Sequence, residues 1–146
     1  MNKISEIIKN KRLLAIDFGL ARVGIAISDE LHISIMPKET LLFQKPDFWE
    51  RLIKIVKNER IGCIIIGIPY DENEEHNMRE PIEAFSSDLA SKINIPFFYQ
   101  DESFSSRQAV DIMLENGKKK KKRSQKGTTD GVAAAIILQS FLEYTV

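Results

Sequence analysis

The chain of 146 residues has one cysteine, so no disulfide can form within it. Cys63 lies inside the apolar run 61–68, which favours a buried thiol and a reducing, intracellular setting. No apolar run approaches the length that crosses a bilayer, and residues 1–12 lack the apolar core of a signal peptide. We therefore expect a soluble, cytoplasmic protein that forms one domain over residues 1–146, with a polar segment at 1–12.

An excess of charge of either sign is also missing, since Lys+Arg and Asp+Glu both number 21. This balance excludes a global attraction to nucleic acid, so any such binding must come from local charge. The two histidines, His32 and His76, are isolated and have no partner at metal-ligand spacing. Apart from Phe104, the few aromatic residues are not interleaved with basic ones, so stacking on bases is not a visible mode of binding.

The order of the apolar patterns predicts the fold class. Two paired strands at Leu13–Ile16 and Val23–Ser28 flank a turn, and Ile33–Phe43, which Pro37 interrupts, carries a third strand. The elements expected after them are a helix from Phe48 to Val56, a strand at Ile61–Ile68, a helix from Pro81 to Ile93, a strand at Ile95–Tyr99, a helix that carries Ala109 and closes at Gly117, and a last helix from Asp130 to Tyr144. This order indicates an α/β, ribonuclease-H-like mixed sheet of five strands, three in an antiparallel meander and two parallel, flanked by helices.

Three acidic positions stand out against this pattern. Asp17 closes an apolar strand, where an ionised carboxylate is costly unless a cation or hydrogen-bond donors compensate it. Asp101 and Glu102 follow the last strand, and Asp130 is expected in the first turn of a helix capped by Thr128 and Thr129, where the helix dipole favours its ionised form. Taken singly, each acid could simply cap a turn or a helix.

Taken together, the acids predict a metal site. Ligands gather at the carboxyl ends of the parallel strands in such a sheet, and carboxylates collected there repel one another unless a divalent cation neutralises them. Mg²⁺ or Mn²⁺ takes oxygen ligands and supports phosphodiester hydrolysis. The residue pattern therefore predicts a metal-dependent nuclease with Asp17, Glu102 and Asp130 as catalytic residues and metal ligands.

The strand 61–68 complicates this arrangement, because it lies between the strands that carry Asp17 and Glu102 and it ends without an acid. Two strand spacings separate the backbones by about 10 Å. Glu102 must therefore reach inward across Gly67, whose missing side chain leaves room. Asp71 and Asp101 are the substitute ligands if it does not.

Basic residues near the last helix predict the contacts to nucleic acid. Residues 118–123 are six adjacent cations, which cannot pack and are expected to form a mobile basic loop over 118–126. A merely solvated loop is the alternative, but the run directly precedes the helix that bears Asp130. The predicted nucleic-acid contacts are Arg22, Arg107, Lys118, Lys119, Lys120, Lys121, Lys122, Arg123 and Lys126.

Four blocks of sequence resemble one known family. The blocks are Ala15-Ile16-Asp17-Phe18-Gly19 with Arg22, Gly24 and Ser28-Asp29, then Ile64 to Pro69, then Asp101 to Ser106, and finally Lys126-Gly127-Thr128-Thr129-Asp130 with Ala133-Ala134. They are similar to the YqgF (RuvX) proteins, which have a ribonuclease-H-like fold and are described as Holliday junction resolvases and as pre-16S rRNA nucleases. The resemblance implies an Mg²⁺- or Mn²⁺-dependent nuclease with Asp17, Glu102 and Asp130 as its acids, acting in maturation of the 5′ end of 16S ribosomal RNA.

Other functions stay open at this point. The chain could resolve branched DNA, which usually requires a homodimer, or it could bind structured RNA or a ribosome precursor without catalysis. Nothing in the sequence decides between a monomer and a homodimer. An Asp-x-Gly turn also occurs in actin-like ATPases, but those close two such domains on ATP and this chain has one copy.

Overall fold

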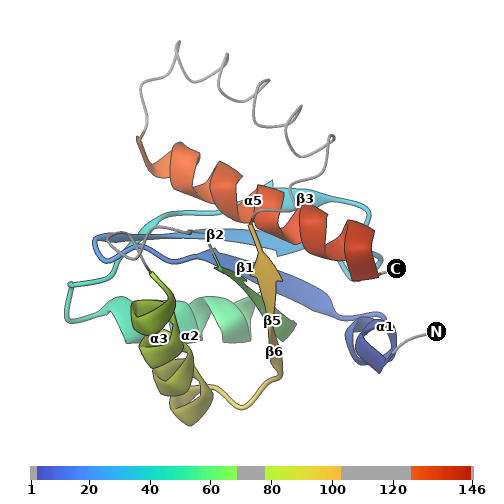
Figure 1. Cartoon of the computed structure of the whole chain (residues 1–146), viewed down its shortest axis with the longest axis horizontal. Helices are drawn as coiled ribbons and strands as arrows, with labels where there is room; N and C mark the ends of the chain where they lie inside the picture. Colours follow the sequence, from blue (N-terminus) through green and yellow to red (C-terminus); the bar gives the residue numbers. More distant parts are fainter. Residues whose placement is uncertain (1–2, 69–77, 103–125, 146) are drawn as a thin grey trace.

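Figure 1 shows the computed structural model, which describes residues 3–68, 78–102 and 126–145. The elements in chain order are α1 (Lys3–Ile8), β1 (Arg12–Asp17), β2 (Arg22–Ser28), β3 (Ile35–Pro37), β4 (Leu41–Leu42), α2 (Phe48–Asn58), β5 (Ile61–Ile68), α3 (Arg79–Lys92), β6 (Phe97–Asp101) and α5 (Lys126–Thr145). The expected helix that closes at Gly117, the basic loop 118–125 and the loop around Asp71 lie outside the described residues.

The strands form one mixed sheet in the order β3-β2-β1-β5-β6, and β4 also pairs with β2. Strand β2 is antiparallel to β1 and β3, whereas β5 and β6 run parallel to β1. The predicted α/β class with a mixed sheet is therefore confirmed. The third strand was expected as one broken piece but forms two short strands, because Pro37 ends β3 and cannot extend the pairing with a backbone N–H.

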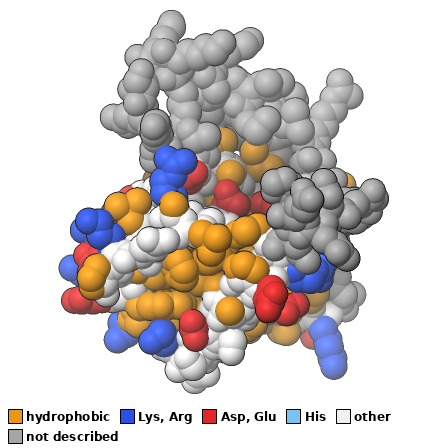
Figure 2. All heavy atoms as spheres, turned by 60° about the vertical axis from the view of Figure 1, so that its left-hand side comes forward, with side chains coloured by type: hydrophobic (Ala, Val, Ile, Leu, Met, Phe, Trp, Pro, Cys, Tyr) orange, Lys and Arg blue, Asp and Glu red, His pale blue; other side chains and the backbone are white. Residues whose placement is uncertain are grey.

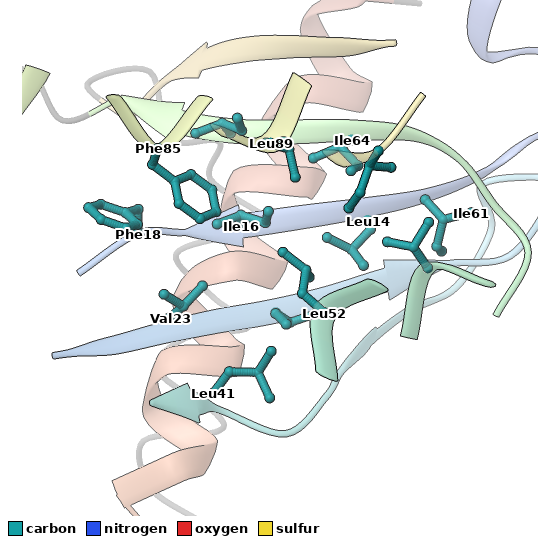
Figure 3. Close-up of a cluster of buried hydrophobic side chains, with 14 of the residues drawn as sticks. Leu14, Ile16, Phe18, Val23, Leu41, Leu52, Ile61, Ile64, Phe85 and Leu89 are labelled. Atoms are coloured by element: carbon teal, nitrogen blue, oxygen red, sulfur yellow. The ribbon is translucent and has the colours of Figure 1, made fainter. Parts of the chain in front are cut away.

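Two separate cores lie on the two faces of this sheet. Helices α2 and α3 cover one face, and α5 covers the other (Figure 1). Successive residues of β1 alternate between the cores: Leu14 and Ile16 belong to the first, Leu13 and Ala15 to the second. Figure 3 shows side chains of the first core gathered between the sheet and the helices that cover it. A central strand buried on both faces gives the site that follows it a rigid base.

Helices α2 and α3 were predicted from apolar spacing, and both form. Phe48, Leu52 and Val56 recur every four residues along α2 and are buried as one stripe. Helix α3 begins at Arg79, two residues before the expected start at Pro81. Proline is tolerated in a first helical turn, where its missing N–H leaves no bond unmade.

The start of α5 differs from the prediction in a way that concerns Asp130. The helix begins at Lys126, so no acidic residue lies in its first turn, and Asp130 sits one turn further along. Threonine is only mildly unfavourable inside a helix, so a Thr-Thr pair that resembles a cap does not oblige the helix to begin after it. The same finding places Lys126 in α5 rather than in a loop.

The start of the chain also contains more structure than a polar segment. Residues 3–8 form α1, which buries Ile8 beside the second core. The Ser5 hydroxyl donates a hydrogen bond of 2.8 Å to the carbonyl oxygen of Thr145, so α1 lies against the end of α5 (Figure 1). Among the described residues, no helix is both long and apolar enough to cross a membrane.

Candidate active site

Asp17 is the last residue of β1, at the end of a fully buried strand. Leu13 to Ile16 are 0% exposed, so the carboxylate stands where the interior of the sheet ends. Its partner across the antiparallel pair is Gly24 of β2. On the other side, the β1–β5 register pairs Ile16 with Ile66, which brings Asp17 to the level of Gly67. Neither neighbour carries a side chain, so the sheet leaves space on both sides of this carboxylate.

Glu102 enters that space from β6. Its backbone N–H donates to the carbonyl oxygen of Ile68 at 2.8 Å, which extends the β5–β6 pairing by one residue. A Cβ atom on Gly67 would lie 3.1 Å from Oε1 of Glu102 and would overlap Ile137 of α5. Glu102 therefore reaches across the glycine, as the sequence required, and its side chain forms a hydrogen bond with that of Asp17.

Asp130 reaches the same end of the sheet from α5. A Cβ atom on Gly24 would lie 2.9 Å from Cβ of Asp130 and would overlap its carbonyl oxygen, so the helix rests directly on this glycine. The Nε atom of Arg22 lies 3.5 Å from Oδ2 of Asp130. This oxygen is buried and accepts no hydrogen bond from any described residue.

The three acids share one electrostatic environment. Burial raises the pKa of Asp17, and the negative charge of Asp130 adds to this effect, while the hydrogen bond from Glu102 opposes it. Burial also raises the pKa of Glu102 to about 7, and the charge of Asp17, the hydrogen bond to Asp17 and the charge of Asp101 act in the same direction. Without a cation, the shared proton therefore resides on Glu102, which donates it to Asp17.

The acids are gathered but are not arranged as three ligands. Within residues 3–68, 78–102 and 126–145, no set of three Asp, Glu, His or Cys side chains is close enough to hold a metal ion. Asp17 and Glu102 contact each other, whereas Asp130 contacts Arg22. Figure 2 shows the end of the molecule where the β1–β2 turn lies, with acidic side chains beside a group of hydrophobic ones and a basic side chain close by.

Comparison with known proteins assigns the family. The family model described as "RuvX: Holliday junction resolvase" matches residues 11–144. The chain belongs to the RuvX family. Among curated relatives, the "Putative pre-16S rRNA nuclease" of Bacteroides fragilis is 41% identical over 140 residues, which cover 90% of this chain and 96% of the relative. The protein of the same name from Chlorobaculum tepidum is 36% identical over 138 residues, covering 92% and 94%.

Solved structures support the fold of this RuvX chain. T. thermophilus RuvC in complex with a Holliday junction substrate gives a TM-score of 0.56 at 13% identity, covering 92% of this chain and 96% of the other. The fowlpox virus resolvase in complex with Holliday junction DNA gives 0.57 at 16% identity, covering 92% and 99%. These likenesses agree with the predicted ribonuclease-H-like fold.

The remaining predicted site residues fall into two groups. Asp101, a substitute ligand, ends β6 opposite Ile68 and lies next to Glu102, which reaches Asp17 itself. Lys126 begins α5. The other substitute ligand and most of the predicted nucleic-acid contacts lie outside the described residues, namely Asp71, Arg107, Lys118, Lys119, Lys120, Lys121, Lys122 and Arg123.

Sequence reasoning missed two features of this candidate site. It assigned Arg22 to phosphate alone, although the side chain contacts Asp130. It noted Gly24 only as part of the family resemblance and did not foresee that the backbone of Asp130 rests on it. The signal for Gly24 was present, because a glycine inside an otherwise apolar strand often marks close approach of another backbone. No sequence signal indicated the pairing of Arg22 with Asp130.

Proposed function

We propose that this RuvX chain is a nuclease that hydrolyses phosphodiester bonds with Mg²⁺ or Mn²⁺ bound by Asp17, Glu102 and Asp130. The observation that carries this proposal is the meeting of two carboxyl groups over Gly67, with a third carboxylate close enough to raise the pKa of Asp17. These groups come from the end of β1, the end of β6 and α5. A structural role alone gives no reason to bring acidic side chains from three elements to one partly buried place.

The residues fit a divalent cation. All the donors are carboxylate oxygens, the ligands that Mg²⁺ and Mn²⁺ prefer. Oδ2 of Asp130 is buried without a hydrogen bond from the described residues, and the proton between Glu102 and Asp17 occupies a place that a cation can take. When bound, such a cation activates a water molecule and lowers the cost of charge on the leaving oxygen.

The rest of the chain holds these groups in place. The backbone N–H of Phe43 donates to the carbonyl oxygen of Ala21 at 3.0 Å, which fixes the turn after Asp17. The ring of Phe18 lies 4.9 Å from that of Phe43 and 4.7 Å from that of Phe85, centroid to centroid. This packing holds the turn after Asp17 in one conformation before substrate binds. Arg22, whose side chain is 46% exposed, is the described cation best placed to bind a phosphate.

The names of the relatives support pre-16S ribosomal RNA as the substrate, and the 5′ end of that RNA is the cleavage region that we propose. The description of the family model supports a second candidate, branched DNA at a four-way junction. The basic run 118–123, with Arg107 and Lys126, would supply contacts to the nucleic-acid backbone in either case.

The test compares cleavage of precursor 16S RNA with cleavage of a four-way DNA junction, in Mg²⁺, in Mn²⁺ and in chelator. The proposal expects metal-dependent cleavage of the RNA, and Asp17→Asn should reduce its rate at least about 100-fold while leaving RNA binding intact. Asp88→Asn, at an exposed carboxylate on α3, serves as the matched control and should cleave normally.

Preferential cleavage of the junction would identify branched DNA as the substrate and leave the proposed metal-dependent chemistry unchanged. Cleavage in chelator would contradict the mechanism. RNA binding without cleavage in either metal would support a non-catalytic role in ribosome assembly.

A further inference from the structure

The direction of the Arg22 side chain is set by the strand that follows it. Arg22 pairs with Leu42 of β4, and the next pair, Val23 with Leu41, is buried in the first core. Because side chains alternate along a strand, Arg22 and Leu42 point to the opposite face, the one that α5 covers. The guanidinium therefore meets Asp130 at 3.5 Å while remaining about half exposed.

The backbone of Asp130 has little freedom, but its side chain can turn. Its carbonyl oxygen and Cβ rest against Gly24, so the helix cannot move toward the sheet. Rotation about χ1 is the adjustment that remains, and a single side chain changes rotamer on a fast timescale. The carboxylate of Asp130 thus contacts the guanidinium of Arg22 and also lies near enough to Asp17 for its charge to raise the pKa of Asp17.

We propose that Arg22 is a positioning residue that holds Asp130 away from Asp17 and Glu102 and competes with a divalent cation for this carboxylate. The inference rests on the proposed function. It accounts for two observations together: Asp130 contacts Arg22, and no three carboxylates of the described residues stand at ligand spacing. Turning of Asp130 from Arg22 toward Asp17 completes the ligand set and frees the guanidinium for a phosphate.

The affinity for Mn²⁺ alone, measured by electron paramagnetic resonance without nucleic acid, tests this competition. Arg22→Gln should bind Mn²⁺ about two- to fivefold more tightly than the wild type, the range that a half-exposed ion pair can contribute. A residue that merely supported the fold would have the opposite effect. The matched control is Arg51→Gln, because the Nε atom of Arg51 lies 3.0 Å from a carboxylate oxygen of Asp47 at the start of α2. Its affinity should equal that of the wild type.

A second comparison separates competition from the simple loss of a positive charge near a cation. In the Asp130→Asn background there is no carboxylate for Arg22 to hold, so adding Arg22→Gln should leave the Mn²⁺ affinity unchanged. The Nε–H resonance of Arg22 should also shift on titration with Mg²⁺ in the wild type and stay in place in Asp130→Asn.

Equal tightening by Arg22→Gln in both backgrounds would overturn the inference, because a general charge effect would explain it. Equal affinity of the wild type and Arg22→Gln would overturn it while leaving the proposed metal site intact. Absence of Mn²⁺ binding by the wild type and all variants would overturn both the inference and the proposed function.

Discussion

Two glycines determine what can surround Asp17. Gly24 and Gly67 stand on its two sides in the sheet, and each gives its place to another acid: Asp130 rests on the first and Glu102 reaches over the second. A glycine weakens a strand because it packs no side chain and costs more conformational entropy. Here that cost creates the space in which carboxyl groups from separate elements meet.

Gly67→Ala tests this use of space. The added methyl group would overlap Ile137 and come within 3.1 Å of the Glu102 carboxylate, so the variant should lose about 1–3 kcal/mol of stability in urea unfolding. It should also bind Mn²⁺ more weakly. The control is Gly62→Ala on the same strand, where the three atoms nearest to the new Cβ all belong to the side chain of the exposed Lys11 and lie 2.9–3.0 Å away. Full Mn²⁺ affinity in Gly67→Ala would show that Glu102 does not depend on this gap.

The protonation of Glu102 predicts a pH dependence of stability without metal. Because its pKa rises from 4.5 to about 7 on folding, the folded state favours the protonated acid. Its contribution to stability is therefore complete below about pH 4.5 and is lost as the pH rises through about 7. The free energy of unfolding of the wild type should fall over this interval relative to that of Glu102→Gln. Urea unfolding in chelator at several pH values measures it, with Glu83→Gln as the exposed control. Parallel curves for the wild type and Glu102→Gln would contradict the assignment of the proton.

At the scale of elements, the two faces of the sheet have different tasks. The first core, under α2 and α3, supports the sheet, whereas α5 on the other face also carries Asp130. Substitutions in the first core should therefore lower the stability of the protein. Substitutions at the contact between α5 and the sheet should lower the cleavage activity.

A pair of substitutions separates these tasks. Leu52→Ala removes a fully buried side chain of α2 and should cost about 2–5 kcal/mol, with cleavage per folded molecule unchanged. Gly24→Ala would place a methyl group where the backbone of Asp130 in α5 now rests. It should abolish most of the cleavage activity, even in the molecules that stay folded. Denaturant unfolding and single-turnover cleavage measure the two effects. Loss of cleavage in folded Leu52→Ala would contradict the division.

The elements also show how far the sequence predicts this molecule. Apolar periodicity predicted α2, α3 and the strands β1, β2 and β5, because these segments are buried and burial leaves a regular pattern. The predicted start of α5 was wrong, because the sequence signals at a helix end are weak compared with the packing of the whole helix. The reach of Glu102 across Gly67 followed from strand order. The contact of Arg22 with Asp130 did not, because it depends on side-chain geometry between β2 and α5.

At the scale of the whole molecule, the fold brings together three distant parts of a chain with no net charge. Asp17 ends a central strand, Glu102 follows an edge strand, and Asp130 lies on the helix that covers one face. Burial, together with the repulsion between neighbouring carboxylates, raises the pKa values of Asp17 and Glu102. A bound cation would remove this repulsion.

Crystals soaked in a manganese salt test this claim most directly, because the anomalous signal locates the ion without reference to activity. The account predicts one strong peak at about 2 Å from carboxylate oxygens of Asp17, Glu102 and Asp130, with Asp130 turned away from Arg22. A map without a peak between these residues at saturating manganese, or a peak elsewhere with the hydrogen bond between Asp17 and Glu102 intact, would contradict it.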